Sequence, residues 1–187
     1  TVSTINHRAD IVQRALQKSA AGQLLTDADI LHTRYTLDGE ENATTAWENF
    51  QLDGFGTWLW ALAEHQRITA ISLPDEVMQA ARITADYIEG LWRLPCYDCW
   101  EEFKEKIHPH TLAAIYGGLK AYGELTGDQR DAATSAIRSF ILENAQVDGY
   151  WQKFLGNSQV DASLLALSTP YRLVNPDDST MRRTAEK

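Results

Sequence analysis

The sequence predicts an all-α fold, and two observations carry this prediction. Apolar residues recur at the three- and four-residue spacing of amphipathic helices through most of the 187-residue chain. No apolar-polar alternation long enough to indicate a β-strand appears. Helices joined by alternately short and long connections are typical of α/α arrangements, in which long loops gather at one end and carry function. We therefore expect a single all-α domain over residues 1–187.

The first part of the chain predicts two helices separated by a long loop. Apolar and small residues, separated by polar ones, recur over residues 8–25, which we expect to form the first helix. Residues 31–50 contain Gly39 and a threonine-rich stretch and are expected to form a loop. Residues 51–65 are apolar on most faces, so this segment should be an inner, well-buried helix.

A third helix is predicted over residues 72–91. Ser72 is the candidate N-cap, Pro74 lies near the first turn, and Asp75 and Glu76 follow where the helix dipole favours acidic side chains. This helix should deliver the chain to a loop that contains Pro95.

The remaining elements are predicted from the same signals. A helix should run over residues 109–126 and end at Gly127, because glycine commonly ends helices. A further helix is expected over residues 128–144 and a short irregular or extended segment over 147–155. Residues 161–167 should form a short helix, and Pro176 could start the last one.

Composition excludes several classes of partner. The chain has 17 Lys and Arg against 26 Asp and Glu, a net charge of −9, which argues against nucleic acid. No run of about 18 apolar residues is present, which argues against a membrane partner. Six Trp and seven Tyr suit sugar binding, because flat rings stack on the apolar face of a pyranose. The first residues form no signal peptide and lack an initiator Met, so we expect an internal piece of a longer chain and favour a cytoplasmic location.

The two cysteines, Cys96 and Cys99, are not expected to bind metal or to act in redox chemistry. A tetrahedral zinc site needs four ligands, and the sequence contains no second pair. A redox motif would start a helix in a βαβ unit, which the pattern does not predict. His108 and His110 flank a proline, which is poor metal geometry, so we expect them to make structural hydrogen bonds. No metal or cofactor is predicted.

Two segments carry motifs with chemistry. Residues 95–102 read Pro-Cys-Tyr-Asp-Cys-Trp-Glu-Glu, and residues 47–54 read Trp-Glu-Asn-Phe-Gln-Leu-Asp-Gly. They resemble the motifs P-x-x-D-L-W-E-E and W-G-x-x-Q-x-D-G of the glucoamylase-type inverting glycoside hydrolases, glycoside hydrolase family 15. This resemblance implies an (α/α)6 barrel, and the predicted helices account for about half of one.

Glycoside hydrolysis with inversion needs two carboxyl groups roughly 6.5–9.5 Å apart, one to protonate the leaving oxygen and one to activate water. By the resemblance, Glu101 is the general acid. Glu102 then contacts sugar hydroxyls, Trp100 lies beside the bound glucosyl unit, and Trp47 stacks near the site. The four side chains are expected to converge on one cleft.

Further positions follow from the same resemblance. Asp98 and Cys99 belong with the substrate-binding residues, Cys99 as a small apolar wall residue where the family has Leu. Gln51, Asp53 and Tyr97 are expected to support the loop. At residues 48 and 49 the chain departs from the family, which removes the basis for substrate contacts there.

Two parts of the family's site have no counterpart in the sequence. In the family, the general base is a Glu in the last part of the barrel, which we expect beyond Lys187. An Arg-Asp pair that binds the non-reducing glucose is expected before residue 1. Arg34 is too far from an Asp to replace that pair.

The leading hypothesis is therefore part of an inverting, exo-acting hydrolase of α-linked glucosides or trehalose. The alternatives are a non-catalytic glucoamylase-like carbohydrate-binding, scaffold or regulatory module, and a plain helical-repeat interaction domain. The piece alone is expected to be inactive, and to self-associate or bind the complementary part of the barrel.

Overall fold

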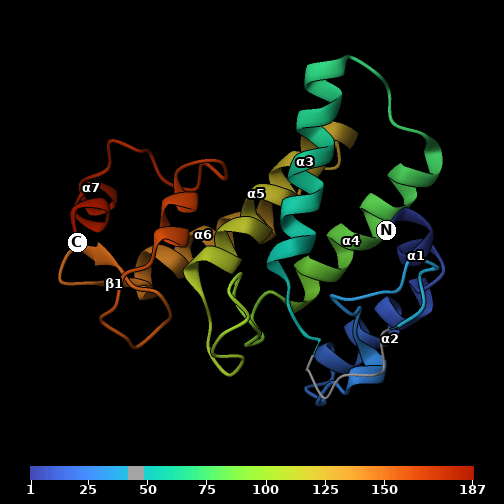
Figure 1. Cartoon of the computed structure of the whole chain (residues 1–187), viewed down its shortest axis with the longest axis horizontal. Coiled ribbons are helices and arrows are strands. Elements are labelled where there is room, and N and C mark those ends of the chain that lie inside the picture. The colour runs from blue at the N-terminus through green and yellow to red at the C-terminus, as the bar shows by residue number, and fades with distance from the viewer. Residues whose placement is uncertain (42–48) are drawn as a thin grey trace.

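The computed structural model describes residues 1–41 and 49–187, and the regular structure of this part is almost entirely helical (Figure 1). The α-helices are α1 (Val2–Asn6), α2 (Ala9–Ala20), α3 (Asp53–Thr69), α4 (Asp75–Leu91), α5 (Pro109–Thr126), α6 (Asp131–Asn144) and α7 (Ser179–Glu186). The other elements are two 3-10 helices, η1 (Asp27–Asp29) and η2 (Ala162–Leu167), and the antiparallel strands β1 (Gln146–Val147) and β2 (Tyr150–Trp151). The all-α prediction is confirmed, because each strand has only two residues.

Several helix ends differ from the sequence prediction. The first helix is preceded by the unpredicted α1 and ends at Ala20 rather than near residue 25. Gly22 causes this early end, since it adopts a φ of +66° and lets the Gln23 N–H donate to the carbonyl of Lys18. The predicted extended segment after α6 forms the hairpin, and the predicted short helix at 161–167 is the 3-10 helix η2.

The expected cap of α4 is also corrected. Ser72 lies outside the helix, and Pro74 is the N-cap residue with a φ of −61° and extended ψ. Asp75 and Glu76 occupy the first turn as expected, where the helix dipole favours acidic side chains. The predicted C-terminal end at Leu91 is confirmed.

The central helix is α5 rather than α3. Helix α5 is buried over most of its length and contacts α3, α4, α6 and η2. In α3 only Asp53, Gly56 and Leu59 are buried, so the expectation that this helix is well buried is wrong within the described chain. The difference arises because α3 has its main contact with α5 along one face.

The elements are spread along the long axis of the molecule, and α3 runs across this axis (Figure 1). The N-terminal helices α1 and α2 contact α4 at one end, and α7 with the β-hairpin lies at the other end. Between them, residues 92–108 form the long connection from α4 to α5. None of the helices in residues 1–41 and 49–187 is long and apolar enough to cross a membrane.

Candidate active site in the 92–108 loop

The turn of the 92–108 loop is built on the carboxylate of Asp98. Its Oδ1 accepts hydrogen bonds from the backbone N–H groups of Trp100 (3.0 Å) and Glu102 (2.9 Å). The N–H of Glu101 donates to the Asp98 carbonyl at 3.0 Å. These bonds hold Glu101 at a φ of 60°, in the left-handed region that residues other than glycine rarely adopt. Asp98 is 3% exposed and shapes this turn, and the expectation that it also contacts substrate stays a prediction.

The two sequence motifs meet in space at the start of α3. The Tyr97 N–H donates to the Phe50 carbonyl at 3.2 Å, which forms a parallel bridge between residues 51 and 97. The side-chain Nε2 of Gln51 donates to the Asp98 carbonyl at 3.0 Å. Gln51 and Tyr97 thus join the two motif segments, and their expected role in supporting the loop stays a prediction. Trp47 lies outside the described residues, so its place beside this loop stays a prediction.

The side chain of Glu101 lies at a cavity of about 690 Å³. The cavity is also lined by Gln51, Phe55 and Trp58 from the start of α3 and by Arg34 from the preceding loop. Arg34 Nη2 lies 3.3 Å from Glu101 Oε2, and the Glu101 side chain is 43% exposed. Among the described residues, Glu101 contributes the one carboxylate to this lining.

Trp100 and Glu102 are not among the residues that line that cavity. Their expected convergence with Glu101 and Trp47 on one cleft stays a prediction, because Trp47 lies outside the described residues. Glu102 Oε2 lies 2.5 Å from Lys153 Nζ, and Trp100 Nε1 donates to Asp161 Oδ1 at 2.9 Å. Trp100 nevertheless remains 56% exposed, so its ring is a fixed aromatic surface on the solvent side of the loop.

Buried titratable groups lie behind the loop. Burial raises the pKa of Asp53, at the first position of α3, and burial lowers the pKa of His110; the interaction between the two groups opposes both shifts. His108 Nε2 lies 3.1 Å from the Phe103 carbonyl, and its Nδ1 lies 3.8 Å from Asp98 Oδ2. The structural role expected of His108 fits this hydrogen bond.

The two cysteines are unpaired thiols. Burial raises the pKa of both Cys96 and Cys99 to about 12, so neither is a thiolate at neutral pH. Cys99 is half-buried beside Ser163, which fits a wall residue better than a reactive one. Within residues 1–41 and 49–187, no group of three or more His, Cys, Asp and Glu side chains could hold a metal ion.

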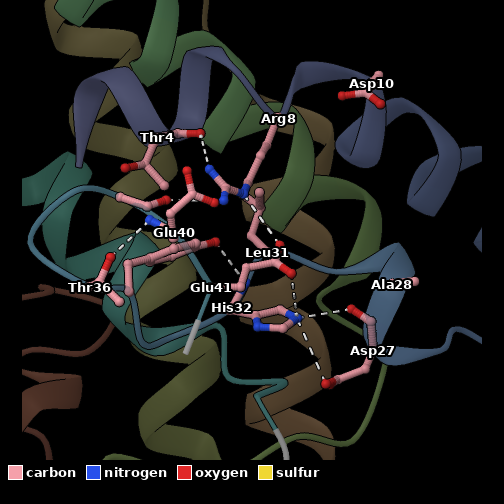
Figure 2. A network of polar contacts seen from close by, with 12 residues as sticks. Thr4, Arg8, Asp10, Asp27, Ala28, Leu31, His32, Thr36, Glu40 and Glu41 are labelled. Carbon is pink, nitrogen blue, oxygen red and sulfur yellow. Dashed lines mark hydrogen bonds and ion pairs between the residues drawn. The ribbon is translucent and has the colours of Figure 1, made fainter. Parts of the chain in front are cut away.

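A network of polar contacts fixes the segment that carries Arg34 (Figure 2). Arg8 Nε lies 3.3 Å from Glu41 Oε1, and its Nη2 donates to the Gly39 carbonyl at 3.1 Å. His32 Nε2 lies 3.0 Å from the Asp27 carbonyl. These contacts tie the segment to Arg8, the N-cap residue of α2, and to η1.

Sequence reasoning missed three residues of the site. Arg34 was considered only as half of an Arg-Asp pair, and its contact with Glu101 spans 67 positions. Lys153 and Asp161 approach the loop from 51 and 61 positions away. No local pattern marks such pairs.

Comparison with known proteins places the chain in a family. The profile described as Glycosyl hydrolases family 15 matches residues 12–186. An isomaltose glucohydrolase from Kribbella flavida is 38% identical over 170 residues, which cover 87% of this chain and 44% of that protein. An uncharacterized glycosyl hydrolase from Methanocaldococcus jannaschii is 27% identical over 170 residues, 81% of this chain and 26% of its own length.

Solved structures agree in fold. A wild-type glycosidase superposes with a TM-score of 0.88 at 35% identity, covering 99% of this chain and 51% of that one. A variant of a glycosidase in complex with glucose gives the same values. The chain therefore spans about half the length of these relatives, and the prediction of an all-α fold with about half of an (α/α)6 barrel is confirmed. On this evidence, the chain belongs to glycosyl hydrolases family 15.

Proposed function

We propose that this chain supplies the general-acid half of the active site of an inverting, exo-acting α-glucoside hydrolase, with Glu101 as the acid. The observation that carries the proposal is the geometry of Glu101. Asp98 holds it in a left-handed backbone conformation, and its carboxyl group lies at a cavity lined by aromatic and polar side chains. Strained positions of this kind are concentrated at active sites.

The lining of the cavity suits one sugar ring. Phe55 and Trp58 offer aromatic surface for the apolar face of a pyranose, while Gln51 and Arg34 offer hydrogen-bond donors to its hydroxyls. Arg34 binds the ionised form of Glu101, whereas a general acid must carry a proton. We therefore propose that substrate hydroxyls draw Arg34 away from Glu101 as the sugar enters.

The general base is proposed to come from outside residues 1–187. An inverting mechanism places a second carboxylate roughly 6.5–9.5 Å from the acid, across a water molecule. In the described residues the lining of the cavity offers no second carboxylate. The relatives are about twice as long as this chain, which leaves room for such a residue.

The proposed substrates are short α-linked glucosides, with isomaltose as the first candidate. The support is the 38% identity to an isomaltose glucohydrolase and the glucose bound in a similar glycosidase variant. Maltose and trehalose are the comparison substrates.

The test is Glu101→Gln in the complete gene product. The amide keeps the shape of the side chain but cannot donate the proton, so kcat on isomaltose should fall by about 10²–10⁴-fold. Glucose binding, measured by calorimetry, should change little. Glu105→Gln is the matched control, because Glu105 is an exposed carboxylate of the same loop that does not line the cavity. Near-full activity of Glu101→Gln would refute the assignment.

A second candidate is a non-catalytic carbohydrate-binding or regulatory module. The lack of a second carboxylate among the described lining residues favours it. It predicts glucose binding by the complete gene product without turnover of any α-glucoside. Proton NMR of the first product distinguishes the two, since the inverting enzyme must release β-glucose from isomaltose.

A further inference from the structure

A distant segment of the chain holds the 92–108 loop in place next to Glu101. Residues 153–163, which follow the β-hairpin and enter η2, contact the loop at Trp100 and Glu102. Trp100 Nε1 donates to Asp161 Oδ1 at 2.9 Å, and Glu102 Oε2 lies 2.5 Å from Lys153 Nζ. The segment therefore binds the residues on both sides of Glu101, while Glu101 itself lines the cavity.

Asp161 is the residue that joins these contacts. Its Oδ1 also accepts from the Ser163 N–H at 2.8 Å, which caps η2, and its Oδ2 lies 3.5 Å from Lys153 Nζ. Lys153 and Asp161 are largely shielded, with 13% and 18% of their side chains exposed. Charge-assisted contacts in such a setting are better ordered than exposed ion pairs.

The consequence is clearest for Trp100. An indole that is 56% exposed would ordinarily change rotamer freely, because little surrounds it. Here its one polar atom is bound to a carboxylate that is itself capping a helix and paired with Lys153. The ring is thereby fixed while its faces remain open.

We infer that Asp161 is a positioning residue, which fixes the indole of Trp100 as a preformed platform for the sugar and keeps the loop around Glu101 in its turn. The inference rests on the proposed function. A platform fixed before the ligand arrives improves binding because no rotamer freedom is lost on association. Burial would raise the pKa of Asp161, but the hydrogen bonds from Ser163 and Trp100 outweigh this effect and lower the pKa to about 2. The carboxylate is therefore ionised at neutral pH.

The test uses the complete gene product labelled with 5-fluorotryptophan. The resonance of Trp100 is assigned from its absence in Trp100→Phe. Asp161→Ala should shift or broaden this resonance and raise KM for isomaltose by about 3- to 10-fold, the usual worth of one hydrogen bond, with a smaller change in kcat. Asp161→Asn keeps the acceptor for both Trp100 and Ser163, so it should restore the wild-type resonance and most of the affinity.

Two controls separate this role from helix capping. Asp178→Ala removes another Asp cap, which accepts from Thr180 and Met181 at the start of α7, and should leave the Trp100 resonance and KM unchanged. In the double variant Trp100→Phe/Asp161→Ala the effects on KM should be strongly non-additive, because both changes break the same contact.

The inference is overturned if Asp161→Ala leaves the Trp100 resonance unchanged, or if the two effects simply add. The test of Asp161 is independent of the test of Glu101 as the general acid. An active Glu101→Gln enzyme would refute the role of Glu101, while the fluorine spectra and the KM cycle would still decide whether Asp161 acts through Trp100.

Discussion

Asp98 determines where the side chain of Glu101 lies. Its carboxylate satisfies two backbone N–H groups of the turn, at Trp100 and Glu102, and so compensates the left-handed conformation between them. The sequence motif identified the Trp-Glu-Glu triplet, but not this division of labour. A motif records which residues occur together; it does not record which of them are buried.

The residues missed by sequence analysis share one property. Arg34, Lys153 and Asp161 reach the loop over long distances in the chain, so their role depends on how the helices are arranged. Local spacing carries information about neighbours on one helix or turn, and it carries none about such contacts. The helical periodicity that predicted the elements therefore could not have predicted the partners of Glu101 and Trp100.

His110 should make stability depend on pH. Burial lowers its pKa below the ordinary value of 6.5, so below about pH 6.5 the unfolded chain binds a proton that the folded chain resists. The free energy of unfolding should therefore fall as the pH drops from 6.5, by at most about 1.4 kcal/mol per pH unit. In urea titrations at a series of pH values from 7.5 to 5, His110→Gln should reduce the dependence of the free energy of unfolding on pH.

His65→Gln is the matched control for that measurement, because His65 is exposed near the end of α3. It should leave the slope as in the unaltered protein. An unchanged slope in His110→Gln would mean that the folded protein protonates His110 as readily as the unfolded one.

At the scale of elements, the contact between α3 and α5 depends on two glycines. A Cβ added to Gly56 would lie 2.3 Å from the Ala114 carbonyl oxygen, and one added to Gly118 would lie 2.5 Å from the Gly56 carbonyl oxygen. The two backbones are therefore in direct contact. This close approach positions the start of α3, with Gln51 just before it, against the helix that follows the 92–108 loop.

Gly56→Ala should consequently destabilise the fold by about 3 kcal/mol, at the upper end of the usual cost of overpacking, since backbone atoms cannot move aside. Gly54→Ala is the control within the same helix, because an added Cβ there meets nothing within 4 Å. It should be neutral or stabilise by about 0.5 kcal/mol. Thermal unfolding of both variants makes the comparison, and equal melting temperatures would contradict this account of the interface.

Element prediction from the sequence worked where a local signal decided the outcome. Pro109 and Gly127 mark the two ends of α5, and both ends agree with the structure. It failed for the burial of α3, because an apolar composition shows that a helix can be buried and not which neighbours cover it. The helix predicted over residues 8–25 ends at Ala20, because Gly22 adopts a positive φ and terminates it.

At the scale of the whole molecule, the chain has the architecture of half a barrel. It spans 51% of a similar glycosidase, and its longest helix, α5, contacts neighbours along the described chain on several sides. Helix α3 is only partly covered, and Ile68 and Ile71 at its C-terminal end are 71% and 62% exposed. Apolar surface of this kind favours association.

The isolated 187-residue chain is therefore expected to self-associate or to bind a complementary half, and to hydrolyse neither maltose, isomaltose nor trehalose. Analytical ultracentrifugation and a glucose-release assay measure both properties. A strictly monomeric chain, or turnover of any of the three sugars, would show that the described helices form a complete unit that contains its own base.

The central claim is that Glu101 protonates the leaving oxygen, and leaving-group dependence tests it most directly. A general acid matters for isomaltose, whose leaving alkoxide needs a proton, and hardly at all for α-glucosyl fluoride, whose fluoride leaves unaided. In the complete gene product, Glu101→Gln should lose about 10²–10⁴-fold in kcat/KM on isomaltose and less than about tenfold on α-glucosyl fluoride. Equal losses on both substrates would contradict the account, because they would assign Glu101 to binding or structure and leave the proton donor elsewhere.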